Sequence, residues 1–311
     1  MKRNPWFMLL VLILIFGSLF AFMVGSAVTS MFGATQVKVA SKNSVLFMKL
    51  DGVIIDGKKF LKPLIKYRNH DHIKAVVVEI NSPGGVVGPS QQIYSELRKV
   101  REVYKKPLII VSNSLVASGG YYSALAGDKI LVAPGTLIGS IGVIMEFINL
   151  EGVYNWAKVQ RYSITTGKYK DSGAEYRSMR EDEKALFQEL ANNVLSQFKK
   201  AVVESRNLKP ESVDQIADGR VFTGEQAVKL GLADGFATVD EAITMAAVQA
   251  GLTEGKYEIF EPPKEHQGLI DRLVGSEDDD GYSSKLDKVL EALAPSKLNN
   301  QLLYLMPGTR L

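Results

Sequence analysis

The chain has 311 residues, of which 46% are hydrophobic and 23% charged, a balance typical of one large folded domain with appendages. Its formal net charge is only +3 and its basic residues are scattered, which argues against nucleic acid as a partner. It contains no cysteine, so disulfides, thiolate metal sites and a cysteine nucleophile are excluded. Three histidines, His70, His72 and His266, lie in polar segments without a metal-binding pattern. We therefore expect no cofactor and no metal ion.

The N-terminal segment is predicted to anchor the chain in a membrane. Residues 5–28 are uncharged and mostly apolar, and Lys2 and Arg3 precede them. An apolar stretch of about 20 residues matches the thickness of a bilayer and is longer than the core of most cleaved signals. A long signal sequence, cleaved beside the small residues Gly25 and Ala27, is the alternative interpretation. The two cations favour a cytoplasmic N-terminus. We expect a single-pass protein of the plasma (inner) membrane with its globular part on the extracytoplasmic side, divided into a cytoplasmic N-terminus (1–5), a transmembrane helix (6–28) and a linker (29–43).

The next part of the chain alternates apolar runs with amphipathic segments. Strands are predicted at 44–55 with a turn at Asp51-Gly52, at 73–80, at 108–111 and at 130–132, and helices at 60–68 and 91–104. The β-branched runs are typical of strands that are buried on both faces of a parallel sheet. Strand–helix–strand crossovers of this kind are right-handed, so the loops that follow the strands emerge at one sheet edge. The pattern predicts an α/β fold.

Two of these loops have residues suited to acyl-transfer chemistry. The strand at 108–111 leads to Ser118, which stands directly before Gly119-Gly120, and the strand at 73–80 leads to Gly84-Gly85. A serine at a tight strand-to-helix turn exposes its hydroxyl, and glycine N–H groups can hold an oxyanion without obstruction. Ordinary glycine turns are the alternative interpretation of both loops.

A serine nucleophile needs a base, and the histidines are poorly placed to supply one. A lysine can act instead when burial or nearby positive charge favours its neutral form. Lys168 and Lys170 lie in a segment of small polar residues and are both candidates, and the residues alone do not choose between them. Ser140 is expected to lie in a tightly packed turn and strand at 137–143.

The second half of the domain begins with a long amphipathic helix that runs toward Arg206. Ser178 and Glu181 have the spacing of a capping box and predict where this helix starts. A strand at 220–222 follows, and Thr223 with Gln226 predicts the cap of a short helix.

The tail at 256–311 differs in composition, and residues 262–284 are predicted to be flexible. Its apolar end, residues 302–307, could be a docked helix, a core strand or an extended peptide in a groove. One hypothesis is that it binds the active-site groove of its own assembly as a pseudo-substrate.

Five motifs follow one another in the chain: NSPGG at 81–85, ASGGYY at 117–122, GSIGV at 139–143, GKYKD at 167–171 and DGRVFTGEQA at 218–227. In this order they resemble the signal peptide peptidase A family of membrane-anchored serine proteases, over about residues 44–247. The resemblance implies a Clp protease/crotonase-like spiral of β-β-α units for residues 44–255, with catalysis by a Ser-Lys dyad. It makes Ser118 the nucleophile and Lys170 the general base. It also implies that Ser140 orients the lysine and that the N–H groups of Gly85 and Gly119 form the oxyanion hole.

The chain resembles the short form of that family, in which the domain is not duplicated. Each motif occurs once, and the resemblance then implies a homo-oligomer whose dyad is shared between subunits. Its substrates would be remnant signal peptides and other extended apolar peptides at the membrane. Two other functions remain possible from the sequence: a catalytically silent membrane scaffold of the same fold, and a crotonase-type enzyme that acts on acyl thioesters.

Overall fold

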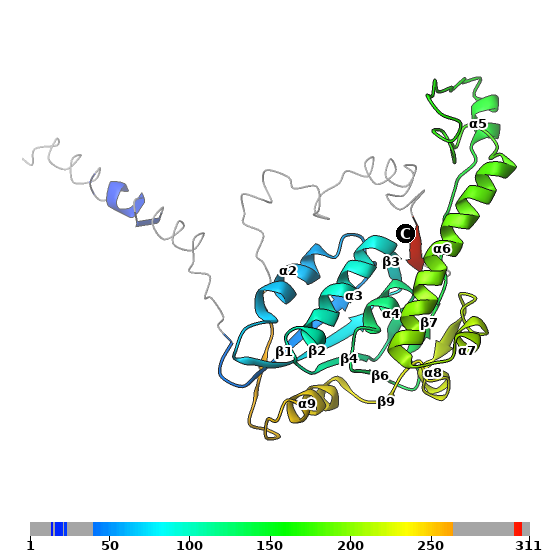
Figure 1. Cartoon of the computed structure of the whole chain (residues 1–311). Coiled ribbons are helices and arrows are strands. Elements are labelled where there is room, and N and C mark those ends of the chain that lie inside the picture. The colour runs from blue at the N-terminus through cyan, green and yellow to red at the C-terminus, as the bar shows by residue number, and fades with distance from the viewer. Residues whose placement is uncertain (1–13, 15, 21, 24–39, 264–301, 307–311) are drawn as a thin grey trace, which may run out of the picture. The chain divides into compact units, whose positions relative to one another are not determined.

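The computed structural model describes residues 14, 16–20, 22–23, 40–263 and 302–306 (Figure 1). Among the described residues, 40–262 and 302–306 belong to one compact unit. Only a few residues of the predicted anchor are described, and they are helical; the rest of the anchor, most of the linker and most of the tail lie outside the described residues. In the described part of the chain, no helix is both long and apolar enough to cross a bilayer.

A parallel six-stranded sheet forms the centre of the compact unit, in the order β10-β1-β2-β4-β6-β9. Its strands are β1 (Ser44–Asp51), β2 (Ile73–Asn81), β4 (Leu108–Ser112), β6 (Lys129–Val132), β9 (Gly235–Phe236) and β10 (Glu258–Phe260). The predicted α/β class with a parallel sheet is confirmed, because the apolar runs at 73–80 and 108–111 are adjacent parallel strands.

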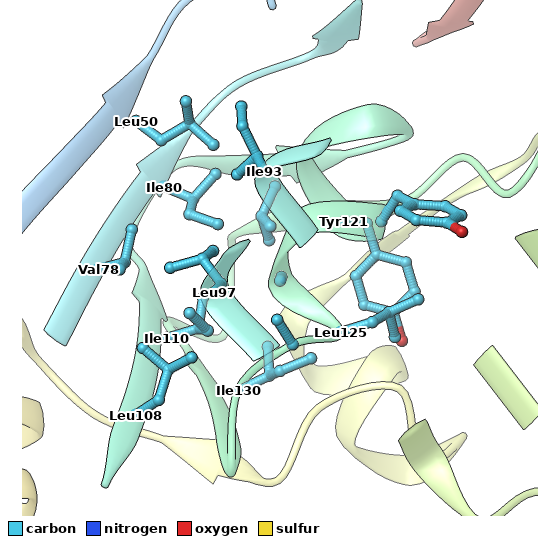
Figure 2. Close-up of a cluster of buried hydrophobic side chains, with 14 of the residues drawn as sticks. Leu50, Val78, Ile80, Ile93, Leu97, Leu108, Ile110, Tyr121, Leu125 and Ile130 are labelled. Carbon is cyan, nitrogen blue, oxygen red and sulfur yellow. The ribbon is translucent and has the colours of Figure 1, made fainter. Parts of the chain in front are cut away.

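Helices cover both faces of this sheet (Figure 1). On one face lie α2 (Lys58–Tyr67), α3 (Val87–Glu102) and α4 (Gly119–Ala124), and on the other lies α9 (Val239–Gln249). Figure 2 shows the larger core, where Ile93 and Leu97 of α3 face Ile80 and Ile110 of the sheet. Burial on both faces explains why these strands are continuously apolar instead of alternating.

Five described short strands lie outside the six-stranded sheet. They are β3 (Gly84–Val86), β5 (Leu115–Ala117), β7 (Leu137–Gly139), β8 (Val221–Thr223) and β11 (Leu303–Leu305). Three of them, β3, β5 and β7, directly follow the long strands β2, β4 and β6 in the chain. β5 pairs with β7 in parallel, β7 with β8 antiparallel, and β11 with β3 antiparallel. The order long strand, short strand, helix therefore occurs in β2-β3-α3 and again in β4-β5-α4.

An arm, defined here as residues 144–190, extends from the compact unit and contains α5 (Glu151–Trp156) and the start of α6 (Figure 1). With 26 residues, α6 (Glu181–Arg206) is about 39 Å long. Its later turns pack on the core through Val194, Phe198, Ala201 and Val202. Its first turns carry mostly exposed side chains, so the tip of the arm stands away from the sheet.

The predicted capping box of α6 was wrong. Arg180 is the N-cap and Glu183 the reciprocal residue, while the Ser178 hydroxyl donates to Glu151 of α5. The second predicted cap is confirmed: Thr223 accepts from Gln226 N–H at 3.3 Å and begins α8 (Gly224–Lys229), which follows the short α7 (Pro210–Asp214).

Candidate active site

Ser118 stands between β5 and α4 in a strained backbone conformation. Its φ of 52° and ψ of −118° lie in a region that side chains rarely adopt, at a cost of about 1–3 kcal/mol. The conformation is held by a bond from Ser118 N–H to Gly139 O at 2.7 Å and one from Tyr122 N–H to Ser118 O at 2.8 Å. The Ser118 hydroxyl is buried and has no hydrogen-bond partner among the described residues. Backbone strain and a buried hydroxyl without a partner both single out Ser118 as a candidate functional residue.

The two glycine loops meet beside Ser118, as the sequence predicted from the sheet topology. A methyl group placed on Gly119 would lie 3.2 Å from Gly85 N, so these two N–H groups are close neighbours. The same methyl group would be 2.4 Å from Ser90 Oγ, which explains why position 119 needs glycine. Ser82 fixes the first loop, because its hydroxyl donates to Gly52 O at 2.6 Å and accepts from Gly84 N–H at 3.1 Å.

Ser140 lies directly beside Ser118. Strand register pairs Ala117 with Gly139, so the serine that follows each of them stands at the same level. Both serines have a φ near +50° and both are buried. The structure thus brings four predicted site residues together: Ser118, Ser140, Gly85 and Gly119.

The C-terminal strand β11 occupies the open edge of β3. Val87 N–H donates to Leu302 O at 3.1 Å and Met306 N–H to Pro83 O at 2.8 Å, with Tyr304 paired to Gly85 between them. On its other side, Leu303 exchanges two bonds with Ile144 at 3.0 and 3.1 Å. Of the three structures considered for residues 302–307, the helix is not found: residues 303–305 form a buried strand paired with β3. The place that this strand fills, between β3 and Ile144, is called the groove below.

The carbonyl group of Tyr304 lies at the point where the serine and the glycines converge. A methyl group on Gly84 would be 2.0 Å from Tyr304 O, 2.6 Å from Gly119 N and 3.0 Å from Ser118 Cβ. These atoms therefore surround one small space. In an antiparallel ladder every second residue pair is hydrogen-bonded. The pairs on either side of Gly85 and Tyr304, Val87 with Leu302 and Pro83 with Met306, are bonded, so Gly85 N–H is directed toward Tyr304 as well.

The Tyr304 side chain fills an aromatic pocket next to this space. Its ring stacks on Tyr122 with centroids 5.2 Å apart and packs against Phe198 at 4.7 Å. Its hydroxyl donates to Val194 O of α6 at 3.1 Å. Burial raises the pKa of the Tyr304 hydroxyl, which therefore remains a neutral donor. The pocket accepts a large apolar side chain with one polar end.

Lys170 is the predicted site residue that the structure does not bring to Ser118. Its side chain is exposed on the arm, and its segment is tied to the first turn of α6 by bonds from Arg177 to Asp171 and from Arg180 to Lys168 O. Along α6, that turn is about 20 Å from Val194, where the helix reaches the aromatic pocket. A dyad within one chain would require the arm to rearrange.

Comparison with known proteins gives the family. The model of the family described as "Peptidase family S49" matches residues 101–253 of the chain. A putative protease of Synechocystis is 35% identical over 77% of this chain and 86% of the relative. A putative signal peptide peptidase of Enterococcus faecium is 30% identical over 76% of this chain and 72% of the relative. The chain belongs to peptidase family S49, the signal peptide peptidase A family. The predicted resemblance is thereby confirmed, and the chain is a protease of this family.

Solved structures similar to this S49 protease include ClpP1 of Listeria monocytogenes, with 15% identity over 63% of this chain and 94% of that one and a TM-score of 0.43. A membrane-bound stomatin-specific protease is 19% identical over 71% of this chain and 98% of that one, with a TM-score of 0.44.

Sequence reasoning missed part of this site. Gly84, with a φ of +100°, is as closely packed as the two glycines that were predicted. The NSPGG motif contained the signal, because two adjacent glycines after a buried strand offer two candidate positions. The aromatic pocket was not predicted, since its members come from positions 122, 198 and 304, which no local pattern connects.

Proposed function

We propose that the protein is a serine endopeptidase of Clp protease/crotonase-like fold with Ser118 as nucleophile and Lys170 as general base. The observation that carries the proposal is the position of the Tyr304 carbonyl, beside Ser118 and the N–H groups of Gly85 and Gly119. A substrate carbonyl at the same point would be open to attack by Ser118 Oγ. The two N–H groups would then stabilise the oxyanion, each contributing about 2.7–4 kcal/mol.

In this mechanism the neutral amine of Lys170 takes the proton of Ser118 as the serine oxygen forms a bond to the carbonyl carbon. The tetrahedral intermediate collapses to an acyl-enzyme, and the leaving amine receives the proton from the lysine. Water, deprotonated by the same amine, then hydrolyses the ester. Ser140, level with Ser118 on the adjacent strand, would hydrogen-bond the lysine and orient it.

The lysine would come from a neighbouring copy of the chain, giving a homo-oligomer with shared sites. Two features support this: the first turn of α6, which holds the Lys170 segment, is about 20 Å along the helix from Val194 at the aromatic pocket, and the arm exposes large apolar side chains. Those side chains are Ile148, Val153, Trp156, Val159, Tyr162 and Ile164. An apolar surface of this kind favours docking on another protein surface.

Substrates would be extended apolar peptides that add a strand to β3, as β11 does. The pocket of Tyr122 and Phe198 would take the residue before the cleaved bond, with a preference for aromatic side chains. Remnant signal peptides have this apolar character. We further propose that the protein is a single-pass protein of the plasma (inner) membrane and meets these substrates on the extracytoplasmic side.

The test uses full-length chains in detergent and an apolar fluorogenic peptide. We expect Ser118→Ala and Lys170→Ala to be inactive alone and active when co-expressed with two different tags and purified through both. Activity that survives in Ser118→Ala would remove the nucleophile assignment. A covalent serine probe that fails to label the wild-type protein at Ser118 would favour a silent scaffold or thioester chemistry instead.

A further inference from the structure

A fully buried carboxylate, Glu183, lies in the first turn of α6, where the other side chains are exposed or partly exposed. Its two oxygens accept from Arg177 at 2.9 Å (Nη1) and 2.6 Å (Nη2), and one accepts from Arg180 N–H at 2.9 Å. The paired Arg177 guanidinium is the main reason that the pKa of Glu183 falls from 4.5 to about 2. A second arginine, Arg180, also lies 2.8 Å from the Glu183 carboxylate through Nη2, so two partly exposed guanidinium groups cover this carboxylate.

Arg177 continues from Glu183 to the segment that carries Lys170. Its Nε donates to the carboxylate of Asp171 at 3.1 Å, and its Nη2 donates to the backbone carbonyl of Asp171 at 3.1 Å. Asp171 directly follows Lys170 in the chain. One guanidinium therefore joins a buried carboxylate on α6 to the backbone beside the proposed base. The planar fork of arginine suits this bridging role, which a lysine could not reproduce.

A second contact holds the same segment from its apolar side. Gly173 has a φ of +77°, and a methyl group there would lie 2.6 Å from the ring of Phe147. That ring packs on Phe187 of α6 with centroids 4.6 Å apart. The segment thus lies flat against α6, held by Arg177 on one side of Asp171 and by the aromatic pair under Gly173.

We propose that Glu183, acting through Arg177, is a positioning residue that fixes the Lys170 segment on α6 and so sets where the lysine enters the neighbouring active site. The inference rests on the proposed shared dyad. Because a base misplaced by about 1 Å can cost about 10²-fold in rate, the segment needs a rigid attachment to the helix that delivers it.

The matched control lies in the same helix turn. Glu181 forms an ion pair with Lys184 at 2.6 Å, with side chains 87% and 56% exposed, and both residues belong to α6. Glu181→Gln removes a carboxylate from the same helix turn as Glu183→Gln but leaves the contacts of Arg177 and of Lys168 intact. We expect Glu183→Gln to lower kcat about 10²-fold with KM within about twofold, since β3 and its pocket are untouched. Glu181→Gln should change kcat less than about threefold.

Co-expression separates positioning from a general structural role. A Glu183→Gln chain keeps a working serine but delivers its lysine poorly, so it should regain activity with Ser118→Ala, whose lysine is intact. It should regain none with Lys170→Ala, which offers only a serine. Equal recovery with both partners, or an unchanged kcat in Glu183→Gln alone, would overturn the positioning role.

The shared dyad and the positioning role of Glu183 can be tested separately. A Ser118→Ala and Lys170→Ala mixture without activity would overturn the shared dyad and this inference with it. Activity in that mixture, without the asymmetry for Glu183→Gln, would overturn only the positioning role. If Glu183→Gln does not fold, Arg177→Lys keeps the charge, removes the fork and should show the same asymmetry.

Discussion

Tyr304→Ala should release β11 from the groove and activate the protease. The Tyr304 ring is fully buried between Tyr122 and Phe198, and its carbonyl occupies the point at which a substrate carbonyl would be attacked. While β11 is bound, a peptide cannot add to β3. The intact chain should therefore be a slow enzyme whose groove is open only part of the time.

The size of the effect follows from the contacts of the ring. Truncating a buried aromatic side chain to alanine costs about 3–5 kcal/mol, and each 1.4 kcal/mol is a factor of ten in occupancy. Because apparent affinity scales with the open fraction, kcat/KM should rise by about 10²-fold until the groove is mostly open. Tyr304→Phe keeps the ring and removes the hydroxyl that donates to Val194 O, a bond worth about 0.5–1.5 kcal/mol, and should give a rise of about two- to tenfold.

The assay compares the full-length wild type, Tyr304→Phe, Tyr304→Ala and a chain that ends at Gln301, all with one fluorogenic peptide. We expect activity to increase in that order, with the last two nearly equal. A synthetic peptide of residues 302–306 should inhibit the shortened chain competitively. If removing β11 leaves kcat/KM unchanged while the thermal unfolding transition is preserved, β11 does not compete with substrate and this reasoning is wrong.

Three further predictions concern single residues. Ser118→Ala should abolish turnover without lowering the thermal midpoint, because the buried hydroxyl it removes has no partner among the described residues; a large loss of stability would contradict this. Gly84→Ala should abolish activity even though it displaces β11, because its methyl group, 2.0 Å from Tyr304 O and 2.6 Å from Gly119 N, would also occupy the place of the substrate carbonyl. Gly88→Ala, with open space around it, should be active. Because the pKa of Glu183 is lowered to about 2, its ionised form stabilises the fold above pH 4.5, and this contribution is lost as the pH falls toward 2. The stability difference between wild type and Glu183→Gln should therefore shrink over that range in acid unfolding experiments, and a constant difference would contradict the assignment.

The sequence contained enough information to place the sheet and one side of the site. β2 and β4 are buried on both faces, so their apolar runs stand out from every neighbouring segment. Once two strands are parallel neighbours, their following loops must meet, and Gly85 and Gly119 do so. Local patterns succeeded here because burial and chain direction are properties of short segments.

Local sequence patterns did not predict contacts that form only after the chain has folded. Ser178 and Glu181 fit the spacing of a capping box, yet Ser178 instead donates to Glu151, twenty-seven residues away. Glu183 carries no sequence signal of burial, because the guanidinium that makes its burial tolerable reaches it only after the arm has folded. The pairing of β11 with β3 joins residues more than two hundred positions apart, so the sequence could suggest the groove only as one of three possibilities.

The position of β11 also links the groove to the arm. Leu303 bonds to Ile144 at the root of the arm, while its neighbours bond to β3, so the strand bridges the two. A substrate peptide added in the same place would make backbone bonds on both sides and would fix the arm root relative to β3. Because the proposed base is carried by the arm of a neighbouring copy, the arm of each chain would take part in two sites: its root beside its own groove and its tip in the next. Peptide binding in one groove would then restrict the arm that supplies the lysine to another groove. We therefore expect the rate of hydrolysis to depend on peptide concentration with positive cooperativity.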